Sequence, residues 1–187
     1  MVVLESDSEL SQGDEAPAFE LPAADGNTYA LSDFAEYEAL LIVFTCNHCP
    51  YAEAKVDELN HLASAYEDLA VVGINPNDAE EYPDDSYERM QERVEAGEIQ
   101  FTAYLRDESQ DVAREYGAVC TPDPFLFEND GGTFRLAFHS RLDDAMNPDA
   151  EPNRYEMREV VEALLAGDEI PIDETPSQGC SIKWTEE

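Results

Sequence analysis

The chain has 187 residues, of which 44 are acidic and 10 are basic, and its formal net charge is −34. Phosphate binding needs a basic face, so this charge excludes nucleic acid as an expected partner, and the same repulsion argues against an anionic membrane. Hydrophobic residues make up 43% of the chain and aromatic residues 10%. This composition excludes a disordered acidic chain and predicts one domain with a full core.

An evenly acidic surface on a folded chain is typical of a cytoplasmic protein from a salt-accumulating halophile. Residues 1–12 are acidic and polar. They lack the basic start and apolar centre of a secretory signal, so a cytoplasmic location is expected. No stretch approaches the roughly 18 apolar residues that a membrane span needs.

We expect the folded state to be less stable in dilute buffer than in molar salt. At molar ionic strength the Debye length is about 3 Å, so the self-repulsion of the surface charges is screened. In dilute buffer this repulsion acts against the compact state. Unfolding midpoints measured by circular dichroism in the two conditions test the expectation, and an unchanged midpoint would contradict it.

The first half of the chain alternates strand-like and helix-like segments. The expected elements are a hairpin over residues 18–31 that turns at Asp25-Gly26-Asn27, a buried strand over 39–45, a helix over 50–66, a buried strand over 69–74, a polar loop over 75–85, and a helix that opens with the capping pair Asp85 and Glu88 and ends at Gly97.

The second half continues the alternation and then closes with a hairpin. The expected elements are a strand over 101–105, a helix over 109–116 closed by Gly117, strands over 125–127 and 134–138, a helix from the capping box 153–156 to Gly167, and a proline-containing tail. Alternating strands and helices imply parallel pairing, and the hairpin adds antiparallel strands. The expected fold class is therefore α/β, a mixed sheet with helices on both faces.

The motif Cys46-Asn47-His48-Cys49 carries the chemistry, because it stands between a buried strand and a helix that begins at Pro50. Two cysteines at this spacing can close a small disulfide ring, as thiol–disulfide exchange requires. A thiol at a helix N-terminus faces unsatisfied N–H groups and the positive end of the helix dipole, and both favour the thiolate. We therefore expect Cys46 to attack a disulfide and Cys49 to resolve the mixed disulfide.

His48 lies between the two cysteines, where an imidazolium would lower the pKa of Cys46. The plainer interpretation is an exposed polar residue in a tight turn. His61 and His139 have no such neighbours and are expected to be surface or packing histidines.

Thr121-Pro122 precedes the strand over 125–127, so this bond is a candidate cis peptide whose outward backbone would meet an extended substrate. An ordinary proline at a strand start is the alternative. Cys120 precedes Thr121 and is therefore expected near the dithiol.

Together these residues resemble the thioredoxin-fold redoxin superfamily, which includes the thioredoxins and the alkyl hydroperoxide reductase/thiol-specific antioxidant proteins, or peroxiredoxins. Residues 13–19 and 31–34 look like the redoxin N-terminal hairpin, Cys46 to Cys49 match the CxxC position, and Thr121-Pro122 falls at the cis proline. The segment from Gly179 to Trp184 and the C-T-P-D segment are similar to a peroxiredoxin-like subgroup. The resemblance implies a thioredoxin-like fold with an N-terminal β-hairpin extension.

The two templates within this resemblance assign different roles to the cysteines. The thioredoxin template makes Cys46 the nucleophile. The peroxiredoxin template aligns its peroxidatic cysteine, which is followed by proline, with Cys49-Pro50. That template also has a threonine three residues earlier, where this chain has Cys46, and an arginine where it has Cys120-Thr121-Pro122. Peroxide reduction is therefore the second choice.

Cys120 and Cys180 leave alternatives open. Either one accepts the disulfide from Cys46 and Cys49, or the two pair with each other, or both are buried structural thiols. A further class is a metal-binding module that holds copper or zinc through Cys46, His48 and Cys49, with or without Cys120. The adjacent positions of His48 and Cys49 make them awkward joint ligands, so no metal and no cofactor are expected in the first choice.

The expected function is a thiol–disulfide oxidoreductase with auxiliary thiols at Cys120 and Cys180. Its expected partners are protein or small-molecule disulfides, with hydroperoxides as the alternative substrate, and a cellular dithiol reductant. The expected organisation is an acidic segment over 1–12, a redoxin domain over 13–167 and a tail over 168–187 that packs on the domain. No oligomeric state is predicted.

Overall fold

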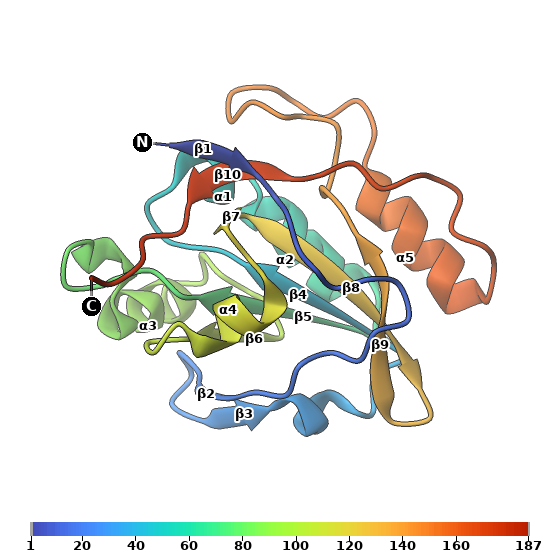
Figure 1. Cartoon of the computed structure of the whole chain (residues 1–187), viewed down its shortest axis with the longest axis horizontal. Helices are drawn as coiled ribbons and strands as arrows, with labels where there is room; N and C mark the ends of the chain where they lie inside the picture. The colour runs from blue at the N-terminus through green and yellow to red at the C-terminus, as the bar shows by residue number, and fades with distance from the viewer. Residues whose placement is uncertain (1, 187) are drawn as a thin grey trace.

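A five-stranded mixed sheet lies at the centre of the computed structural model, which describes residues 2–186 (Figure 1). Its strand order is β6 (Ala103–Arg106), β5 (Leu69–Asn75), β4 (Ala39–Phe44), β8 (Asp123–Asp130) and β9 (Thr133–His139). β5 pairs parallel with β4 and β6, whereas β8 pairs antiparallel with β4 and β9. The predicted mixed α/β sheet is confirmed.

Side chains alternate between the two faces of the sheet along each strand, so β4 contributes to two separate cores, one on each face. From β4, Ile42 and Phe44 join a core with α4 (Asp111–Tyr116), the hairpin β2 (Glu20–Pro22) and β3 (Thr28–Ala30), and the turn η1 (Leu31–Phe34). Leu41 and Val43 point the other way, toward α2 (Val56–Ala65) and α5 (Glu156–Ala166). Every residue of β4 is buried, so the strand that leads into the cysteine motif is fixed from both sides.

Three helix predictions need correction. The single helix over 50–66 is two helices, α1 (Pro50–Glu53) and α2, because the helical hydrogen-bond pattern is interrupted at Lys55, whose backbone N–H donates to the Ala52 carbonyl three residues back. The helix α3 (Tyr87–Glu95) is capped by Ser86, whose hydroxyl accepts the Arg89 N–H, and Asp85 is turned into the interior instead.

The capping box over 153–156 does not form. α5 begins at Glu156, and its N-cap Tyr155 makes no side-chain capping bond. The backbone N–H groups of Asn153 and Arg154 donate to the Asp144 carboxylate instead.

No helix within residues 2–186 is long and apolar enough to cross a membrane.

The two ends of the chain meet in a second, three-stranded sheet with the order β1 (Val3–Glu5), β10 (Gln178–Ser181) and β7 (Cys120–Thr121), at the upper side of Figure 1. Both pairings are antiparallel, and Cys180 lies opposite Thr121. A Cβ added at Gly179 would lie 1.8 Å from the Thr121 carbonyl oxygen, so only glycine permits this approach. The tail thus brings Cys180 to the cysteine motif.

Candidate active site

Three of the four cysteines lie in one buried cluster beside the N-terminus of α1. The sulfurs of Cys49 and Cys180 form a disulfide with a Cα–Cα distance of 6.2 Å, while Cys46 is a free thiol packed beside them. The expected Cys46–Cys49 ring is therefore not the bond present in this structure. The reason is the tail, because its pairing with β7 places Cys180 against Cys49, the N-cap of α1.

The bond between Thr121 and Pro122 is cis, as the sequence indicated. The Thr121 side chain oxygen lies 3.4 Å from the Cys46 sulfur, and its carbonyl oxygen lies 3.7 Å from the Cys49 sulfur. The cis-proline segment therefore contacts both cysteines of the motif from the opposite side of the site.

The Cys46 thiol is held in its neutral form. Burial raises the pKa of Cys46 to about 11, and the nearby Asp85 carboxylate adds to the rise. Hydrogen bonds from Thr121 and from the backbone N–H groups of Cys49 and His48 act in the opposite direction but are outweighed. The expected lowering of this pKa was wrong, because only 1% of Cys46 is exposed and because a carboxylate stands beside it.

Asp85 is the residue that sequence reasoning missed. It is fully buried, and each carboxylate oxygen accepts two hydrogen bonds. Oδ1 accepts from the Asn47 backbone N–H at 2.6 Å and from Asn75 Nδ2 at 3.1 Å. Oδ2 accepts from Asn77 Nδ2 at 3.0 Å and is paired with His48 Nδ1. Two asparagines and an aspartate in the polar loop after a buried strand were the available signal.

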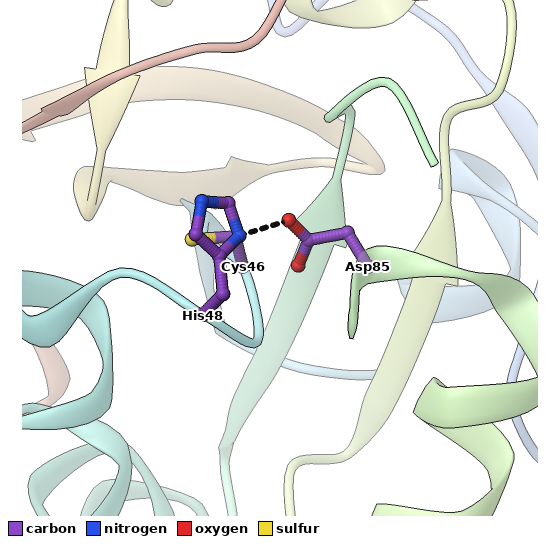
Figure 2. Close-up of side chains that lie close together, drawn as sticks. All are labelled: Cys46, His48 and Asp85. Atoms are coloured by element: carbon purple, nitrogen blue, oxygen red, sulfur yellow. Dashed lines mark hydrogen bonds and ion pairs between the residues drawn. The ribbon is translucent and has the colours of Figure 1, made fainter. Parts of the chain in front are cut away.

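His48 is fixed between this carboxylate and an aromatic ring. Figure 2 shows the imidazole overlapping the Cys46 sulfur in that view, with Nδ1 turned to Asp85. The ring stacks on Tyr82 at a centroid distance of 5.1 Å and an interplanar angle of 11°. Only 17% of the His48 side chain is exposed, so its ring has a fixed position in the site and is not that of a solvated turn residue.

Cys120 was expected near the dithiol, but it lies outside the sulfur cluster and is not bonded to Cys180, because side chains alternate along β7 and the Thr121 side chain is the one that faces Cys46. Cys120 is a free, buried thiol in β7, and burial raises its pKa well above the ordinary value, with the Asp123 carboxylate adding to the effect. His139 Nε2 and Asp123 Oδ1 form a hydrogen bond at 2.6 Å, and the His139 imidazole stacks on Phe125. His61 is exposed. These two histidines have packing or surface positions, as expected.

The AhpC/TSA family matches residues 12–135. The chain belongs to the AhpC/TSA family. A hypothetical protein from Sinorhizobium meliloti 1021 is 39% identical over 98% of this chain and 99% of its own, with a TM-score of 0.89. An uncharacterized conserved protein from Geobacillus kaustophilus is also 39% identical, over 100% of this chain and 98% of its own, with a TM-score of 0.91. No curated protein matches the chain.

A more distant structure shares only the fold with this AhpC/TSA protein. A putative thiol:disulfide interchange protein DsbE from Chlorobium tepidum is 20% identical over 85% of this chain and 98% of its own, with a TM-score of 0.61. The likeness confirms the thioredoxin-like fold. Family and fold together support a thioredoxin-like redox role.

The alkylation rate of Cys46 is expected to rise about tenfold per pH unit until pH about 11, because only the thiolate reacts. A Cys120→Ser variant with the disulfide intact leaves Cys46 as its one free thiol. Iodoacetamide labelling followed by mass spectrometry, with a chelator present, measures the profile. A plateau at or below pH 9.0, the ordinary value for a thiol, would contradict the buried, carboxylate-facing environment.

Proposed function

We propose that this protein is a thiol–disulfide oxidoreductase in which Cys46 is the nucleophile and the Cys49–Cys180 pair stores the resulting disulfide. One observation carries the proposal: a free thiol at Cys46 packs in the same cluster as the Cys49–Cys180 disulfide, against the cis-proline segment. Three neighbouring sulfurs allow a disulfide to pass from one pair to another without a diffusible intermediate.

The reaction starts from the form in which all three cysteines are reduced. The Cys46 thiolate attacks a substrate disulfide and releases one substrate thiolate. The Cys49 thiolate then attacks the Cys46 sulfur, releasing the second substrate thiolate and forming a Cys46–Cys49 bond. Finally the Cys180 thiolate attacks Cys49 and releases the Cys46 thiolate, which leaves the bond seen in this structure. A cellular dithiol reduces that bond, so two electrons pass from the dithiol to the substrate.

His48 is the group placed to take the Cys46 proton. A thiol whose pKa is raised to about 11 is nearly all protonated at neutral pH, so attack needs a nearby base. The ligand-forming atoms of Cys46, His48 and Asp85 all lie within 4.8 Å of one another. In this proposal Asp85 is a positioning residue, because its pairing with Nδ1 fixes the orientation of the ring.

A peroxidase is the second candidate, and a specific observation favours it. Cys49 precedes Pro50, as a peroxidatic cysteine does, and it is bonded to a second cysteine. Attack of a Cys49 thiolate on a hydroperoxide would yield a sulfenic acid and an alcohol, and condensation with the Cys180 thiol would yield this disulfide and water. The contacts of the Cys49 and Cys46 sulfurs with Thr121 supply no cation for the peroxide oxygens.

The experiment that separates the two candidates compares rates of thiol loss in the fully reduced protein, in molar salt. One reaction contains a peptide disulfide and the other contains hydrogen peroxide. Fast loss with the disulfide, together with a peroxide rate like that of free cysteine, supports disulfide exchange. A peroxide rate far above that of free cysteine, with slow exchange, would replace the first candidate by the second.

We also propose that the protein acts in a salt-rich cytoplasm, on the strength of its net charge of −34. The comparison of unfolding midpoints in dilute and molar salt tests the halophilic part of this proposal.

A further inference from the structure

We propose that Cys46, His48 and Asp85 form a binding site for a divalent metal ion of the zinc class. The three residues offer one sulfur, one imidazole nitrogen and one carboxylate oxygen, and these atoms all lie within 4.8 Å of one another (Figure 2). Thiolate, imidazole and carboxylate are the ligands that zinc takes in proteins. The proposal goes beyond disulfide exchange, in which the same sulfur serves only as a nucleophile.

The ligand set differs from the one considered from the sequence. Cys49 is not available in this structure, because its sulfur is bonded to Cys180. Asp85 takes its place, from the turn η2 (Pro83–Asp85), which lies next to the motif in space. His48 and Cys49 are adjacent in the chain, and their side chains diverge, which makes them awkward ligands for one ion. His48 and Asp85 come from separate segments, so this difficulty does not apply to them.

The spacing of the three donors is close to what a tetrahedral ion needs. Metal–ligand bonds of about 2.0–2.3 Å place tetrahedral ligands roughly 3.3–3.8 Å apart. The widest separation in this cluster is at most 4.8 Å, so the outer donors need to approach by about 1 Å. His48 Nδ1 and Asp85 Oδ2 are hydrogen-bonded to each other, so an ion that binds both atoms replaces the proton between them and moves the two atoms apart. Three protein ligands leave a fourth position open, and the partly exposed His48 marks the side from which an ion enters.

The surroundings supply outer hydrogen bonds of the kind that metal sites use. Asn75 and Asn77 hold the Asp85 carboxylate, and the backbone N–H of Asn47 does so as well. Thr121 Oγ1 lies 3.4 Å from the Cys46 sulfur. Such partners orient the residues that bind the ion and tune their basicity, and their loss typically weakens binding by about 10–100-fold. The donors are thus held in place before any ion arrives.

Charge favours a cation at this place. The buried Asp85 carboxylate is one negative charge, and an ion that binds the Cys46 sulfur displaces the thiol proton, so the occupied site carries a second one. A divalent ion balances both charges at once. Among residues 2–186, this is the one group of three histidine, cysteine or acidic side chains that meets the distance requirement for a metal.

Cobalt(II) tests the proposal, because its tetrahedral thiolate complexes absorb visible and near-ultraviolet light. Chelator-treated protein with the Cys49–Cys180 bond intact is titrated in molar salt, and zinc is then added. We expect one cobalt ion per chain, a sulfur-to-cobalt band, and displacement of the ion by zinc. Cys46→Ser should remove the sulfur band. His48→Gln and Asp85→Asn should each weaken binding by at least about tenfold.

Matched controls come from the same chain. Cys120→Ser removes the other free thiol and His61→Gln an exposed histidine, and both variants should bind cobalt like the parent. Circular dichroism midpoints show whether each variant is folded. Absence of a sulfur-to-cobalt band in the folded parent protein would overturn the proposal, as would equal binding by the parent and the Cys46→Ser variant.

Zinc binding and disulfide exchange are separable outcomes. If the site binds zinc, the ion should protect Cys46 from alkylation in the Cys120→Ser background. Metal-free protein that exchanges disulfides but shows no protection would reject the metal site and leave the proposed function standing. Protein that binds zinc but exchanges no disulfide when metal-free would do the reverse.

Discussion

Replacing Cys46 with serine is expected to reduce the rate of disulfide exchange by at least about a thousandfold, because the hydroxyl oxygen is a far weaker nucleophile than a thiolate. The substitution keeps the shape of a residue that is 1% exposed, so folding should be retained. The measurement is the loss of a fluorescent peptide disulfide with dithiol in excess, in molar salt.

Cys120→Ser is the matched control for this variant. Cys120 is equally buried and equally free of a disulfide, yet it lies outside the sulfur cluster. We expect its exchange rate to match the parent. Retained activity in Cys46→Ser would show that Cys49 attacks first, as in the peroxiredoxin template, and would contradict the proposed order of steps.

The fold was readable from the sequence because its signals are local. Alternating apolar runs and amphipathic stretches predicted the strands β4, β5, β8 and β9 and the helices between them. The errors fell where a tertiary contact overrides a local signal. Asp85 looks like a helix cap, yet four hydrogen-bond donors draw it into the interior, and Ser86 takes over the cap.

The site was readable only in part, for the same physical reason. Cys46, Cys49 and His48 share one short motif, and the cis proline is marked by its own sequence. The partner of Cys49 lies 131 residues away, and the Asp85–His48 pair spans 37 residues, so neither pairing leaves a local trace.

The sign of the Cys46 pKa shift followed from these long-range contacts. A helix end favours a thiolate, and that much is visible in the sequence. Burial under the tail and a carboxylate from another loop are visible only in three dimensions, and together they outweigh the local effect.

Loss of the Cys49–Cys180 bond is expected to lower the free energy of unfolding by about 4–5 kcal/mol, because the bond closes a loop with a sequence separation of 131 residues. For a domain of this size that loss corresponds to a fall of roughly 10–20 °C in Tm. The double variant Cys49→Ser, Cys180→Ser, unfolded by heat and by denaturant in molar salt, measures the effect, with Cys120→Ser as the control.

The double variant also tests how a substrate reaches the buried Cys46. β10 packs on α1 and is otherwise held by backbone pairing with β1 and β7. If the bond fixes this strand, the double variant should also show faster alkylation of Cys46 than the Cys120→Ser control at the same pH. Equal midpoints and equal alkylation rates in the two variants would mean that pairing alone holds the tail. Reduction would then leave Cys46 as covered as before, and substrate would have to enter beside His48, which is 17% exposed.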